Sequence, residues 1–137
     1  MKKMINLAFG YAAAALVSGV FYREFTKLNG YTDVTTLGKM HTHLFALGMI
    51  VFLIVALFTI HTTLNEQKQF KQFLIIYNIG VSLTTIMMLI RGILQVLGTP
   101  LSTGANAAIS GIAGIAHIFT GAGLVLLFLA LRKIAKN

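Results

Sequence analysis

The chain has 137 residues, of which 57% are hydrophobic and only 10% are charged, and its net charge is +8. This composition excludes an ordinary soluble domain, in which about a quarter of the residues are charged. The absence of cysteine excludes disulfides, thiolate metal sites and covalently attached c-type haem. We therefore expect a protein that lies in a membrane.

Four apolar stretches have the length of roughly 20 residues that a helix needs to span a bilayer. They cover residues 4–22, 37–60, 73–97 and 107–131. Backbone groups in hydrocarbon must find their partners within the segment, which favours helices, and a β-barrel would show shorter alternating segments. The predicted fold is all-α, a single transmembrane domain over residues 1–137 that forms a four-helix bundle.

The first stretch follows Lys2 and Lys3, as the apolar part of a signal peptide does. It is longer than such a segment, and no clear small-x-small cleavage site follows it before Tyr22, so we interpret it as a retained helix. A polar segment at residues 65–72 forms the second connection, and a glycine-rich segment with the only proline, at residues 98–104, forms the third.

The positive charges predict the orientation of the bundle. One face carries both termini and the second connection, and it holds seven cations: Lys2, Lys3, Lys68, Lys71, Arg132, Lys133 and Lys136. The other face holds three: Arg23, Lys27 and Lys39. This bias predicts both termini on the cytoplasmic side of a bacterial plasma membrane. The net charge then reflects topology and attraction to anionic lipid, and we expect no nucleic-acid partner.

Three histidines lie within the predicted spans, where an imidazole is costly unless it has a partner. His41 and His43 begin the second helix, and His117 lies early in the fourth. All three are predicted to lie in the outer half of the membrane. On a helix His41 and His43 are about 200° apart, so they point to opposite sides and are badly placed to hold the same metal ion.

Arginines and glycines accompany these histidines. Arg91 lies near the end of the third span, and Arg23 lies at the end of the first. Neutral imidazoles in an apolar site, with guanidinium groups near its rim, suit haem b, whose iron takes axial histidines and whose propionates pair with arginine. Glycines at positions 114 and 121, on the face of His117, and at position 48 after His41 would leave room for a flat ring.

The sequence also allows other interpretations of the same residues. The glycines are equally suited to close packing between helices. Arg91 is alternatively paired with Glu24 as a buried ion pair. A copper or zinc protein would use Met40 with the three histidines, although softer ligands would be expected for copper. A third interpretation is a non-catalytic subunit that stabilises a respiratory complex, with its histidines satisfied by neighbouring helices.

Four segments resemble a family of small four-helix bacterial membrane proteins of unknown function: residues 21–26 (FYREFT), 40–45 (MHTHLF), 91–95 (RGILQ) and 111–117 (GIAGIAH). That family in turn resembles, distantly, the catalytic subunit of haem–copper oxidases and nitric oxide reductases. In that subunit twelve helices form three groups of four, and a His-x-His on the second helix of one group ligates two different haems.

The resemblance implies a homotrimer whose twelve helices reproduce that ring, with His41 and His43 as haem ligands and Arg91 near a propionate. The departures are a missing His-His pair for copper and a missing tyrosine at the oxygen-reducing site. We therefore expect a b-type haem protein that transfers electrons, from a quinol or a redox protein, or binds a diatomic gas such as nitric oxide or oxygen. The expected site comprises His41, His43, His117, Arg91 and Arg23.

Overall fold

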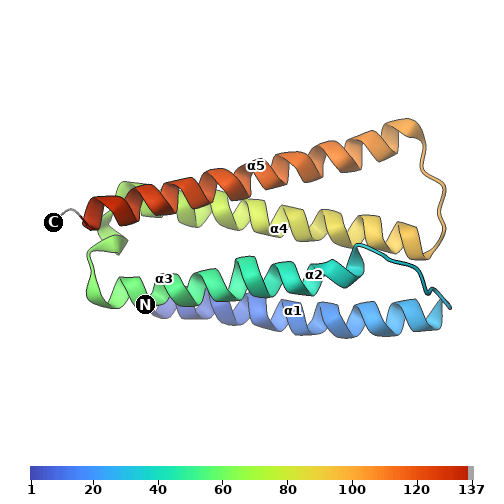
Figure 1. Ribbon diagram of the computed structural model, residues 1–137, viewed down its shortest axis with the longest axis horizontal. Helices are drawn as coiled ribbons and strands as arrows, with labels where there is room; N and C mark the ends of the chain where they lie inside the picture. Colours follow the sequence, from blue (N-terminus) through green and yellow to red (C-terminus); the bar gives the residue numbers. More distant parts are fainter. Residues whose placement is uncertain (136–137) are drawn as a thin grey trace.

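The computed structural model describes residues 1–135, and Lys136 of the charge count lies outside them. Four long helical segments follow one another (Figure 1). They are α1 (Lys2–Leu28), a second segment made of α2 (Leu37–His43), η1 (Leu44–Ile50) and α3 (Val51–His61), then α4 (Lys68–Val96) and α5 (Thr103–Ile134). Each is long and apolar enough to span a membrane. The expectation of an all-α chain with four such helices is confirmed.

The helices extend beyond the predicted spans. The first was expected to end at Tyr22 and continues to Leu28, and the fourth begins at Thr103 rather than near residue 107. The polar segment at residues 65–72 is a connection only in part, because α4 begins at Lys68. Hydropathy marks only the part of a helix that prefers lipid, whereas the backbone hydrogen bonds continue into the polar ends.

Glycine ends two of the helices at the same end of the molecule. Gly30 and Gly98 follow α1 and α4 with φ angles of +60° and +61°, a left-handed conformation that glycine adopts without strain. At the start of α5 the Ser102 hydroxyl accepts a hydrogen bond from the backbone N–H of Ala105 at 3.2 Å. The third predicted connection therefore consists of a glycine stop followed by a serine cap.

The helices pack in chain order. α1 lies along the second segment, α2 contacts α4, and the largest contact joins α4 to α5 (Figure 1). The start of α1, the connection before α4 and the end of α5 lie at one end, which we call the N-terminal end. The connections after α1 and α4 lie at the other end, which we call the loop end.

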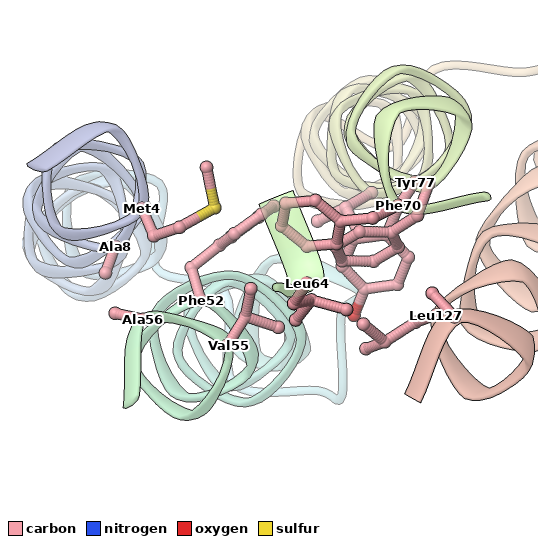
Figure 2. Close-up of a cluster of buried hydrophobic side chains, with 12 residues drawn as sticks. Met4, Ala8, Phe52, Val55, Ala56, Leu64, Phe70, Tyr77 and Leu127 are labelled. Atoms are coloured by element: carbon pink, nitrogen blue, oxygen red, sulfur yellow. The ribbon is translucent and has the colours of Figure 1, made fainter. Parts of the chain in front are cut away.

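The main core lies in the half of the bundle nearer the N-terminal end. We call it the core cluster, and its buried members are Met4, Ala8, Phe52, Val55, Ala56, Leu64, Phe70, Phe73, Tyr77, Val81, Leu127 and Ala130. Figure 2 shows Phe52 reaching from α3 toward the rings of α4, with Leu127 approaching from α5. The Phe52 and Tyr77 rings meet edge to face with centroids 6.0 Å apart. All four helices are thus tied together at this end.

Candidate haem site

The three histidines lie at a similar level of the bundle. Tyr77 of α4 contacts Leu47 in the second segment and Gly123 in α5, which aligns the three segments at one level. Nearer the loop end, Gly92 of α4 packs against Leu37 at the start of α2. Arg91, the residue before Gly92, donates a hydrogen bond to Ser110 of α5. His43 and His117 lie between these two levels. At about 1.5 Å per residue, each is roughly 10 Å from the level of Arg91.

His41 and His43 face different surroundings. His41 faces α1, because a Cβ added at Gly19 would lie 3.9 Å from the His41 Cβ and Cγ. Its Nδ1 is buried and has no hydrogen-bond partner among residues 1–135. His43 lies on the other side of α2, where its Nδ1 is 2.9 Å from the Lys39 carbonyl oxygen. The two rings therefore belong to separate environments within one chain.

His43 and His117 make the same hydrogen bond. The His117 Nδ1 lies 2.7 Å from the Ala113 carbonyl oxygen, four residues earlier, as His43 Nδ1 does with Lys39. A carbonyl oxygen can only accept, so each Nδ1 carries the proton and the Nε2 of the neutral ring keeps its lone pair. A backbone bond of this kind also fixes the ring, as it does for metal-ligating histidines. Both Nε2 atoms are suited to a metal.

His43 and His117 each lie on a helix face that continues from the core cluster. Leu47 lies one turn after His43, and Leu124 lies two turns after His117, so each leucine shares a helix face with its histidine. Both leucines pack against the core cluster. The two histidines therefore lie on the continuation of these faces toward the loop end, where His43 is half-buried and His117 is exposed.

The glycines separate into two kinds. A Cβ added at Gly123 would meet the Cβ and Cα of Tyr77 at 2.7 and 2.8 Å, so this glycine lets α5 approach α4. At Gly114 and Gly121, beside His117, an added Cβ would have no described heavy atom within 4 Å apart from the local helix. Open space next to His117 is what a flat ring needs. Gly48 was expected to provide such space, and this is wrong, because the Tyr11 ring fills it.

Of the two arginines, Arg91 lies near the histidines. Its Nη2 donates a hydrogen bond to the Ser110 Oγ at 2.8 Å, and Ser110 precedes His117 by two turns on the same face of α5. Arg23 is 80% exposed and its Nε lies 3.8 Å from Glu24 Oε1. The alternative pairing of Arg91 with Glu24 is not formed, because each has a different partner.

The ligand set of the copper or zinc interpretation is not assembled within the described part of one chain. No three His, Cys, Asp or Glu residues among residues 1–135 are close enough to hold a metal ion. His41 faces α1, His43 lies on the other side of α2, and His117 lies on α5.

The sequence analysis did not predict a π-helix after His43 or two hydrogen bonds made by tyrosines between helices. Residues Leu44–Ile50 form a π-helix directly after His43, and the Tyr77 hydroxyl donates to the Leu47 carbonyl within it at 2.9 Å. π-helical segments are frequent at functional sites. The Tyr11 hydroxyl donates to the Asn78 Oδ1 at 2.8 Å. Tyr11, Tyr77 and Asn78 are polar groups within apolar spans, and this is the signal in the sequence that points to them.

The comparisons with known proteins bear on the family alone. No curated protein and no solved structure matches the chain. One family model, described as protein of unknown function (DUF2871), matches residues 1–134. This match covers nearly the whole chain, and the protein therefore belongs to the DUF2871 family.

Proposed function

We propose that the protein is a b-type haem-binding membrane protein, with His43 and His117 as the ligands of the haem iron. The observation that carries this proposal is the hydrogen bond that each Nδ1 donates to its own helix, which leaves Nε2 free for a metal. The space beside Gly114 and Gly121 supports it, because a porphyrin is flat and apolar. His41, with its unpartnered Nδ1, is the alternative ligand on α2.

Arg91 is the proposed partner of a haem propionate. It lies on the side of α4 that faces α5, held by Ser110, roughly 10 Å from the level of His117. A guanidinium pairs with a carboxylate through two parallel hydrogen bonds, which positions it as well as neutralising it. We do not assign a propionate to the exposed Arg23.

A bound haem would supply one-electron redox chemistry or a site for a diatomic gas such as nitric oxide or oxygen. The chain would hold the ring and orient both imidazoles through the carbonyl oxygens of Lys39 and Ala113. Two axial histidines favour electron transfer, because no coordination position is then open to a gas. Binding by one histidine alone would favour gas chemistry.

The membrane arrangement is part of the proposal. We place both termini on the cytoplasmic face of a bacterial plasma membrane, because seven cations on that side oppose three on the other. We also propose a homotrimer, from the resemblance to the twelve-helix subunit of haem–copper oxidases. The open glycine at position 111 supports close helix contact between copies. Crosslinking that detects only monomers in lipid would refute the trimer.

The proposal is tested by the visible absorption spectrum of detergent-purified protein, oxidised and then reduced with dithionite. Sharp bands in the reduced protein, lost on His117→Ala and on His43→Ala, are expected. His61→Ala is the matched control, because His61 is exposed at the N-terminal end, and it should keep the spectrum. Loss on His41→Ala with retention on His43→Ala would move the ligand to His41. Carbon monoxide should shift the bands only if a coordination position is open.

A colourless protein from haem-sufficient cells would refute the proposal. Metal analysis of the same sample then separates the remaining interpretations. Stoichiometric copper or zinc would favour a metal protein assembled from more than one chain. Absence of metal, together with loss of a respiratory complex in His117→Ala cells, would favour a structural subunit.

A further inference from the structure

A long groove runs along the side of the bundle between α1 and α4, with Met40 and Leu44 of the second segment in its wall. It consists of two adjoining hollows of about 560 and 420 Å³, and the two share Ala14, Leu44, Thr85 and Ile86 in their walls. Volumes of this size are typical of small-molecule sites. The groove extends from Asn6 to Phe21 of α1, a rise of roughly 22 Å.

One half of the groove is polar although it lies deep in the apolar part of the helices. The Tyr11 hydroxyl bonds to the Asn78 Oδ1 at 2.8 Å, and Ser82 lies beside that hydroxyl. Ser82 is exposed and is close to the midpoint of α4, which spans Lys68–Val96. Polar atoms that face hydrocarbon at this depth are costly and are a sign of function. The Tyr11 and Asn78 side chains bond to each other and to the Leu74 carbonyl, so the exposed Ser82 hydroxyl is the group with which an acyl chain alone could form no hydrogen bond.

The groove is also neutral. Within the described part of the chain, no Asp, Glu, Lys, Arg or His lines either hollow. A phospholipid headgroup would place a phosphate without a cation there, so a neutral polar head fits better. The other half is lined almost wholly by apolar side chains such as Val17, Phe21, Leu89 and Ile93. Such a wall suits a long hydrocarbon tail.

Space for a flat head exists beside the polar group. Gly10 lines the polar half, and a Cβ added there would meet no described heavy atom within 4 Å beyond its own helix. A ring with two oxygen atoms could lie at Gly10 and accept a hydrogen bond from Ser82. We propose that this groove binds an isoprenoid quinone, with its ring between Gly10 and Ser82 and its tail along Val17 and Leu89. The choice of a redox-active lipid rests on the proposed haem function. The binding of a neutral lipid with a polar head and an apolar tail does not depend on it.

The test is photolabelling of the full-length protein in lipid nanodiscs with an azido-quinone that carries a decyl tail. Labelling should saturate, should be displaced by unlabelled decyl quinone, and should map to peptides that contain Tyr11 or Ser82. Ala14→Phe fills the part shared by both hollows, and it should weaken binding about tenfold. Ala122→Phe is the matched control, because Ala122 is exposed on α5, and it should leave binding unchanged.

Labelling that does not saturate, or that Ala14→Phe leaves unchanged, would overturn the proposal. Native mass spectrometry that finds a tightly held phospholipid, or a second copy of the chain, released by Ala14→Phe would also overturn it. The assay is run on haem-free and haem-loaded protein. Quinone binding by a chain that takes up no haem would support the groove while refuting the haem, and haem uptake without labelling would do the reverse.

Discussion

Replacing Gly123 by alanine tests the contact between α4 and α5. The added Cβ would lie 2.7 Å from the Tyr77 Cβ and 2.8 Å from its Cα. Carbon atoms pack best at about 3.5–4.0 Å, so the helices would have to separate by about 1 Å. Tyr77 cannot yield easily, because its ring is fully buried and its hydroxyl is bonded to Leu47.

The expected magnitude combines two opposing effects. Overpacking of this kind costs about 1–3 kcal/mol. Alanine recovers up to about 1 kcal/mol of helix propensity relative to glycine. Gly123→Ala should therefore lower the free energy of unfolding by about 1–2 kcal/mol. Gly114→Ala on the same helix is the matched control, because the site is open. It should be neutral or stabilising by up to about 1 kcal/mol.

The measurement is equilibrium unfolding in mixed micelles of dodecyl maltoside and SDS, followed by circular dichroism of the helices. Because both variants gain the same helix propensity, Gly123→Ala should be less stable than Gly114→Ala by the overpacking cost of about 1–3 kcal/mol. Equal stability of the two variants would refute the assigned α4–α5 contact. A destabilised Gly114→Ala would show that a neighbour covers that face. The haem proposal adds that Gly114→Leu lowers haem occupancy while leaving the helical content unchanged.

Three further outcomes are expected. Tyr77→Phe should lower the free energy of unfolding by about 0.6 kcal/mol, because the Leu47 carbonyl loses its donor and this is the typical value for a hydrogen bond between membrane helices. An unchanged unfolding curve would contradict this expectation. Gln95→Leu should cost about 0.5–1.5 kcal/mol in the same titration, because its Oε1 accepts hydrogen bonds from the two threonines that precede α2. Full stability would show that water replaces the glutamine. Arg91→Ala should reduce the haem retained through purification, measured as pyridine haemochrome per chain, whereas Arg23→Ala should not; equal retention in both would remove Arg91 from the site.

The similar level of the histidines could be anticipated from the sequence. Counting residues from the ends of apolar spans places His41, His43 and His117 in one layer, because a helix rises by a constant amount per residue. The opposite directions of His41 and His43 also follow from helix geometry. Their actual neighbours do not follow, since they depend on how each helix is rotated and which helix lies beside it.

The role of each glycine required the structure. In the sequence Gly48, Gly114 and Gly123 look alike, and each lies within an apolar helix. In the bundle Tyr11 fills the space at Gly48, α4 presses against Gly123, and Gly114 stays open. A glycine carries no side chain whose polarity or size would indicate its surroundings. Its role is therefore set wholly by the approach of other segments.

The sequence by itself determined the four helices, their apolar character and the family, because these depend on local composition and on the need to satisfy backbone groups within each segment. The tertiary structure alone decided which side of α2 faces α1, that Arg91 bonds to Ser110 rather than Glu24, and that a neutral groove lies between α1 and α4. These features depend on the rotation and pairing of helices. In a chain that is apolar on nearly every face, the hydrophobic pattern leaves that rotation undetermined, and it is set by close packing and a few hydrogen bonds.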